Sequence, residues 1–116
     1  ADVKGSMQSS LVDLSGIIKG LGENDYVVEV EGHTDNVPIR TRQFPSNWEL
    51  SSLRAVNVAR LFEKVGVKKD QLSAIAYADT RPKLPNTDET GNAIPANQGT
   101  NRRVVVHVKK LSVVED

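Results

Sequence analysis

The chain has 116 residues, of which 38% are hydrophobic and 26% charged, and this is the composition of one folded domain rather than of a disordered segment. Its 15 basic and 15 acidic residues balance, which argues against the net basic surface of a nucleic-acid-binding protein. It contains no cysteine, so disulfides, thiol catalysis and cysteine-based zinc sites are excluded.

The amino-terminal part of the chain predicts a helix followed by a strand. Residues 6–20 repeat apolar side chains at helical spacing, which indicates an amphipathic helix. In residues 26–31 valines alternate with glutamates, which predicts a strand with one buried face. The strand is expected to stop at Gly32, and a loop rich in polar and turn-forming residues then runs to Pro45.

The next segment predicts the clearest helix of the chain. Ser46 and Glu49 have the capping-box spacing, in which the serine caps the backbone and the glutamate reaches back toward it. The helix is expected to run to about Val65 and to end at Gly66. At about 100° per residue one face gathers the residues expected to pack in the core. They are Trp48, Ser52, Ala55, Ala59 and Phe62.

The carboxy-terminal half predicts two strands with an irregular stretch between them. Residues 72–77 read as a strand. From 78 to 102 prolines and glycines rule out a long helix, although residues 96–103 have room for a helical turn or two. Residues 103–109 predict the closing strand, with one face formed by Val104, Val106 and Val108.

These elements predict a single domain over residues 1–109, followed by a tail at 110–116. Within it, residues 1–25 form a helix and a lead-in, and residues 26–109 form the core. Alternating helices and strands in this number imply helices packed on one side of a small mixed β-sheet. The expected fold is therefore a two-layer α/β sandwich.

Polar residues gather at the ends of three predicted elements, where binding groups are often held. They are His33-Thr34-Asp35, the stretch from Asn47 to Arg54, and Asn101-Arg102-Arg103. Asp35 and Arg54 suit a zwitterionic ligand, because a carboxylate holds an ammonium group and a guanidinium holds a carboxylate. The alternative is that these two side chains pair with each other or are solvated.

Other chemistries have little support in the sequence. His33 and His107 are the only histidines, and they occur in no metal-binding motif, so structural or surface roles are expected for both. The serines lack a nucleophile elbow, and no glycine-rich phosphate loop is present. We therefore expect no catalytic residue, no metal site and no cofactor.

Three motifs together resemble those of the OmpA-like peptidoglycan-binding family. They are Gly32-His33-Thr34-Asp35, the run NWELSSLRA from Asn47 to Ala55 with Val58 and Leu61 after it, and Asn101-Arg102-Arg103-Val104. The matching part covers residues from about 26 to 108. The phrase HTDNVPI, the long loop from Asp35 to Arg54 and the NWELS helix start are most similar to flagellar stator B subunits of the MotB/PomB type.

The resemblance implies a site for the peptide stem of peptidoglycan, in particular for the zwitterionic end of diaminopimelate. Asp35 matches the ligand-binding aspartate of the family, and Arg54 matches its ligand-binding arginine. Four further residues match positions that line or support that site: Thr34, Asn47, Leu50 and Arg102.

The resemblance also implies a non-enzymatic, periplasmic anchor that works as a homodimer beside a stator A subunit. No apolar run approaches the roughly 18–20 residues that span a bilayer. The chain begins at Ala1 with no visible signal peptide, so an upstream segment is expected to have been removed. The resemblance implies that a tether to the inner membrane belongs to that upstream part. Two alternatives remain open: an outer-membrane anchor of the OmpA/Pal type, and a cell-wall hydrolase that uses His33 and Asp35 as acid and base.

Overall fold

The computed structural model describes Asp13, Gly16 and residues 26–110. The helix expected over residues 6–20 therefore lies outside the described residues except at those two positions, which are both helical. The end of the expected tail, 111–116, also lies outside them. In the described part of the chain, no helix has the length and apolar character to cross a membrane.

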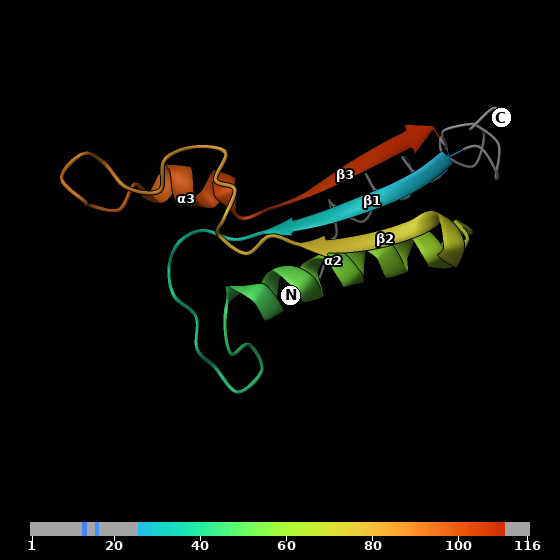
Figure 1. The fold of residues 1–116 in the computed structure, drawn as a ribbon, viewed down its shortest axis with the longest axis horizontal. Helices are drawn as coiled ribbons and strands as arrows, with labels where there is room; N and C mark the ends of the chain where they lie inside the picture. Colours follow the sequence, from blue (N-terminus) through green and yellow to red (C-terminus); the bar gives the residue numbers. More distant parts are fainter. Residues whose placement is uncertain (1–12, 14–15, 17–25, 111–116) are drawn as a thin grey trace, which may run out of the picture.

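A mixed three-stranded sheet forms the centre of the described fold. Strand β1 (Tyr26–His33) lies in the middle, parallel to β2 (Leu72–Ala76) and antiparallel to β3 (Arg103–Lys110). Helix α2 (Asn47–Lys64) links the two parallel strands and lies along one face of the sheet (Figure 1). A short 3-10 helix η1 (Lys69–Gln71) precedes β2. The expected α/β sandwich with a small mixed sheet is confirmed.

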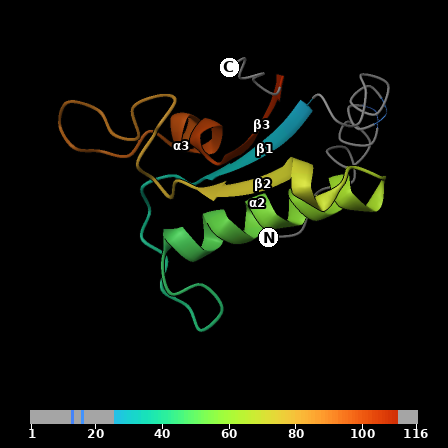
Figure 2. The ribbon, with the colours of Figure 1, turned by 45° about the vertical axis from the view of Figure 1, so that its right-hand side comes forward.

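The second helix of this region lies where β1 ends and β3 begins. Helix α3 (Pro95–Asn101) leads directly into β3, and a turned view places it at the same end of the sheet (Figure 2). The helical turns expected near residues 96–103 are thereby confirmed. The long irregular segment before α3 projects from this end of the molecule (Figure 1).

The core lies between α2 and the sheet, and it follows from the alternation along β1. The valines that alternate with glutamates are fully buried, because every second side chain of a strand faces the same side. The helix contributes small and aromatic residues to the same layer. The buried cluster consists of Val28, Val30, Ala55, Val58, Phe62 and Val67.

Both ends of α2 form as its sequence predicts. The Ser46 hydroxyl oxygen accepts a hydrogen bond from the Trp48 backbone N–H at 3.2 Å, and the same hydroxyl donates to the Glu49 carboxylate. The first bond satisfies a backbone N–H that a helix start otherwise leaves unpaired, and the second holds the Glu49 side chain against the cap. The helix stops before Val65, and Gly66 follows with a φ of 110°, a conformation that glycine adopts without strain.

The buried face of α2 is rotated by about one position from the predicted face. Trp48 is 54% exposed and Ser52 is also exposed, so the prediction that these two residues pack in the core is wrong. Ser51 is buried instead, together with Ala55, Val58 and Phe62. The reason is a close approach of backbones, since a Cβ atom built on Gly32 would lie 2.0 Å from the Ser51 carbonyl oxygen. The glycine lets the helix rest on β1 along its Ser51 side.

The strand ends also differ slightly from expectation. Strand β1 continues past Gly32 because its last two residues pair with the start of β3, His33 opposite Arg103. Strand β2 ends at Ala76, one residue early, and β3 reaches Lys110, one residue late. On β3 the residues Val104 and Val106 pack against the core as expected, whereas Val108 is exposed.

Candidate functional site

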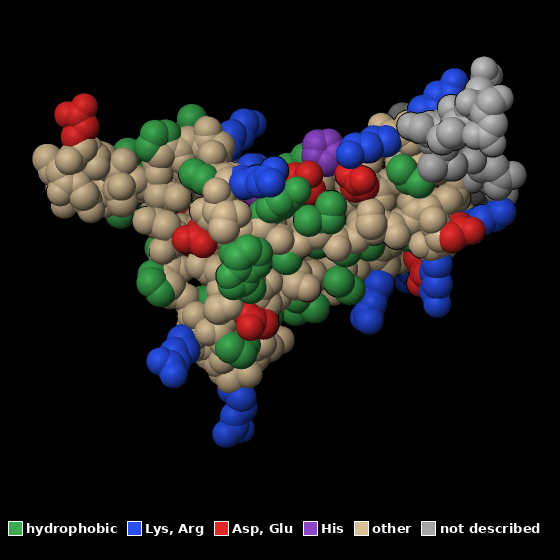
Figure 3. Space-filling view, in the orientation of Figure 1, with side chains coloured by type: hydrophobic (Ala, Val, Ile, Leu, Met, Phe, Trp, Pro, Cys, Tyr) green, Lys and Arg blue, Asp and Glu red, His purple; other side chains and the backbone are tan. Residues whose placement is uncertain are grey.

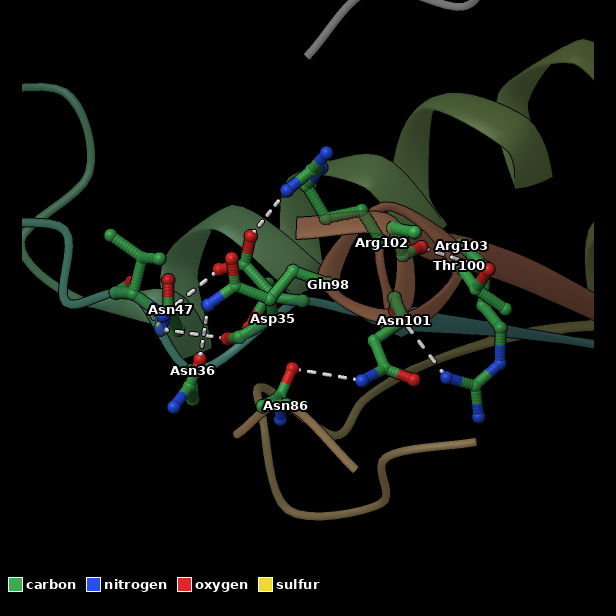
Figure 4. A network of polar contacts seen from close by, with 12 residues as sticks. Asp35, Asn36, Asn47, Asn86, Gln98, Thr100, Asn101, Arg102 and Arg103 are labelled. Atoms are coloured by element: carbon green, nitrogen blue, oxygen red, sulfur yellow. Dashed lines mark hydrogen bonds and ion pairs between the residues drawn. The ribbon is translucent and has the colours of Figure 1, made fainter. Parts of the chain in front are cut away.

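The three polar groups singled out in the sequence meet at one end of the sheet. Because β3 is antiparallel to β1, the first residue of β3 lies beside the last residue of β1. The loop that leaves β1 is bonded to the first residue of α2 and to α3 (Figure 4). Residues distant in sequence thus line a common region around Asp35.

Asp35 is largely buried, and both of its carboxylate oxygens are engaged. Oδ1 accepts a hydrogen bond from the backbone N–H of Val37 at 3.0 Å. Oδ2 accepts from Nη1 of Arg102 at 2.5 Å, and only 10% of the Asp35 side chain is exposed. The ionic partner of Asp35 is therefore Arg102, 67 residues away, and not Arg54.

Arg54 is half-buried on α2 and has few partners. Its Nη1 donates to the carbonyl oxygen of His33 at 3.5 Å, and within the described residues it forms no ion pair. Burial lowers the pKa of the Arg54 guanidinium, the positive charge of Arg102 lowers it further, and the negative charge of Asp35 opposes both. A guanidinium carries five N–H donors, so most of those on Arg54 remain available to a ligand.

Thr34 and Asn47 fix the backbone around Asp35. The backbone N–H of Thr34 donates to the Ala78 carbonyl at 2.8 Å, and its hydroxyl donates to the Asp35 carbonyl at 2.8 Å. The Asn47 amide donates to the carbonyls of Asp35 at 3.4 Å and Val37 at 3.2 Å. Both residues therefore position the loop. Leu50 is half-buried on the first turns of α2, and the structure gives its side chain no polar role.

Two buried amides complete the site, and sequence reasoning missed their contacts. Gln98 of α3 donates from Nε2 to Oδ1 of Asn36 at 2.9 Å, which ties α3 to the residue after Asp35. Asn101 is fully buried; its Oδ1 accepts from the backbone N–H of Lys83 and Leu84, and its Nδ2 donates to Leu84 and Asn86. Figure 4 shows this network. The only signal in the sequence was the position of these amides just before the last strand.

The two histidines lie near the site but face the other side of the sheet from α2. His33 is 2% exposed, stacks on Tyr77 with ring centroids 5.1 Å apart, and contacts Glu31 Oε1 through Nε2 at 3.1 Å. Burial lowers the pKa of His33, against the raising effect of its bond to Glu31. His107 contacts the other oxygen of Glu31 at 2.9 Å. The described residues include no group of histidines and carboxylates arranged to hold a metal ion.

A separate groove runs along α2 and the edge strand β2. It has a volume of about 490 Å³ and is open to solvent. Its lining residues are Trp48, Glu49, Ser52, Leu53, Val56 and Ala76. On the face shown in Figure 3, Lys and Arg side chains are scattered rather than gathered into one basic patch.

The fold is that of a known family. The OmpA family model matches residues 1–96, and the chain belongs to the OmpA family. It is 38% identical to Motility protein B of Bacillus subtilis over 87 residues, which is 74% of this chain and 31% of the relative. The chain thus spans about a third of the length of this curated relative.

Solved structures agree with this assignment. The C-terminal domain of Helicobacter pylori MotB has a TM-score of 0.80 and 27% identity, covering 95% of this chain and 78% of that one. The cell wall anchor of the T6SS from Pseudomonas aeruginosa has a TM-score of 0.71 and 31% identity, covering 95% and 70%. The resemblance first seen in three short motifs is confirmed by both sequence and fold.

Proposed function

We propose that this domain binds the peptide stem of peptidoglycan noncovalently and thereby anchors a larger protein to the cell wall. One observation carries the proposal: the buried Asp35 carboxylate lies in the same site as the Arg54 and Arg102 guanidinium groups, each of which makes only one side-chain hydrogen bond among the described residues. Such a site suits the zwitterionic end of diaminopimelate, which presents an ammonium and a carboxylate on one carbon. Membership of the OmpA family supports it.

In this proposal Asp35 binds the ammonium group and Arg54 binds the carboxylate. A carboxylate has about four lone-pair positions, so Asp35 can accept an ammonium hydrogen while Val37 and Arg102 keep their bonds. Arg54 can present a fork of two N–H groups to a carboxylate. Thr34 and Asn47 hold the loop, and Leu50 lines the site beside Arg54. No metal or cofactor takes part.

The relatives support an anchor for a motility machine. Motility protein B and the MotB domain point to a flagellar stator subunit, and the T6SS cell wall anchor shows that the same fold occurs in another wall-bound assembly. We therefore place the domain in the periplasm, in a homodimer beside a stator A subunit, with a tether to the inner membrane. An outer-membrane anchor of the OmpA/Pal type is the alternative within the same binding chemistry.

Binding rather than hydrolysis follows from the surroundings of His33. A general acid or base must come within hydrogen-bond reach of the bond that is cleaved. The His33 ring is sealed under Tyr77 and turned toward Glu31, so it has no path to a substrate at Asp35. The domain is accordingly proposed as a binding module without catalytic residues.

Cosedimentation with purified sacculi tests the function. The domain should pellet with sacculi, and no soluble muropeptides should appear in the supernatant. Release of muropeptides would support the hydrolase alternative, and failure to pellet would contradict the binding function. The upstream sequence of the full protein separates the two anchors, since an inner-membrane helix with a carboxylate indicates a stator and a lipid-attachment motif indicates the outer membrane.

Substitution of the two charged residues tests the site itself. Asp35→Asn and Arg54→Ala should each weaken sacculus binding about 10- to 150-fold, because one charged contact is worth about 1.5–3 kcal/mol. Glu89→Gln and Arg60→Ala change the same charges at exposed positions away from the site and should bind as the parent does. Melting curves should show that all four variants fold. Parental binding by Asp35→Asn or Arg54→Ala would contradict the site assignment.

A further inference from the structure

The charges of the site do not balance for a simple zwitterion. Asp35 supplies one negative charge, whereas Arg54 and Arg102 supply two positive charges that act on each other across the site. A ligand with one ammonium and one carboxylate carries no net charge and leaves one guanidinium without a counter-charge. The site is better matched to a ligand end with two carboxylates and one ammonium.

Arg102 is placed to receive that second carboxylate. Its side chain reaches from the end of α3 to Asp35 and is held there through Nη1 (Figure 4). Its Nη2 lies beside Gly99, where an added Cβ atom would be 3.4 Å away. The side chain remains 47% exposed, and the Asp35 carboxylate is its single hydrogen-bond partner among the described residues. A guanidinium that is held by one hydrogen bond and remains half exposed keeps further N–H donors for a carboxylate.

Peptidoglycan offers a ligand end of this charge. Diaminopimelate at the end of a stem tripeptide uses one of its two amines in the peptide bond. It therefore keeps one ammonium and two carboxylates, with a net charge of −1. When the stem is amidated at its terminal carboxylate, the zwitterionic end is unchanged but the second negative charge is lost.

We infer that Arg102 binds the terminal carboxylate of the stem, so that the site selects stems with a free terminal carboxylate over amidated ones. This inference rests on the proposed function, in which Asp35 and Arg54 hold the zwitterionic end. Arg102 then determines specificity, and its bond to Asp35 positions it before the ligand arrives.

Two synthetic stem tripeptides test the inference by calorimetric titration. Both end in diaminopimelate, one with a free terminal carboxylate and the other with a terminal amide. The parent domain should bind the free acid about tenfold more tightly, the size expected of one partly exposed charged contact. Arg102→Gln should bind both peptides within about twofold of each other. Because the ratio between two peptides is measured, a general loss of affinity or stability in the variant cancels.

Two further variants sharpen the test. Arg60→Gln removes the same charge from an exposed position of α2 and should keep the tenfold preference. Arg102→Lys keeps the charge but lacks the planar fork, so its preference should fall between those of the parent and Arg102→Gln.

The possible results distinguish a failure of the inference about Arg102 from a failure of the proposed function. A tenfold preference that survives in Arg102→Gln overturns the inference, as does equal binding of both peptides by the parent. If the parent binds both peptides equally while Asp35→Asn binds neither, the proposed function stands and the role of Arg102 falls. If the parent binds neither the peptides nor sacculi, the proposed function itself is wrong.

Discussion

At the end of β1, residues only two positions apart have opposite surroundings. His33 is sealed against Tyr77 on one side of the sheet, whereas Asp35 accepts its bond from Arg102 at the sheet end. The sequence indicated Asp35 as a binding residue because it follows a strand, and it indicated a structural or surface role for His33. The only ion pair that the sequence suggested for Asp35 was with Arg54, and the true partner could not be predicted, because α3 brings Arg102 within reach only in the fold.

Because His33 is buried, we expect the domain to lose stability in acid. Burial lowers the pKa of His33 in the folded state, so the unfolded chain takes up the proton first as the pH falls below the ordinary value of 6.5. Stability is then lost on acidification. The pKa of Glu31 is also lowered: burial alone would raise it, but the bonds and charges of His33 and His107 outweigh that effect. Glu31 therefore adds a further loss of stability as the pH falls below its ordinary pKa of 4.5.

Urea unfolding at pH 7.5 and pH 5.5 measures this effect. The parent should lose stability between the two values, and His33→Gln should lose less, because its side chain does not titrate. An equal slope in the parent and in His33→Gln would show that His33 is not responsible.

At the scale of elements, local sequence signals predicted where α2 begins and ends, but not how it contacts the sheet. The start and end of α2 depend on residues within one turn, and both formed as Ser46, Glu49 and Gly66 indicated. The face that α2 buries was misjudged because it depends on β1. A serine on a helix is not recognised as a core residue, yet Ser51 is fully buried and accepts a hydrogen bond from the Ala78 backbone N–H at 3.0 Å.

The contact between β1 and α2 predicts a severe effect of Gly32→Ala. An added methyl group would collide with backbone rather than with a movable side chain, so the helix must shift. The expected cost is about 1–3 kcal/mol or more, with displacement of the loop that carries Asp35. Gly99→Ala is the matched control, since its methyl group would meet only the end of the Arg102 side chain. Thermal unfolding should show a clear drop for Gly32→Ala alone; equal melting temperatures would contradict the close contact.

At the scale of the whole molecule, the order of elements was enough to predict the sandwich. A helix between two strands favours parallel pairing of those strands, and the last strand then joins the open side of the sheet. The long segment before α3 could not be predicted, because its position depends on the buried amide of Asn101. That segment and α3 together bring Arg102 to the site.

The central claim is that the ligand binds at the sheet end around Asp35, and a titration followed by nuclear magnetic resonance tests it most directly. Addition of the free-acid stem tripeptide to the isotope-labelled domain should shift the amide signals of residues 34–37 and those around Arg54 and Arg102. Signals of Leu72 and Ala74, which line a groove between α2 and β2, should stay in place. Shifts concentrated at Leu72 and Ala74, with none at residues 34–37, would contradict the account.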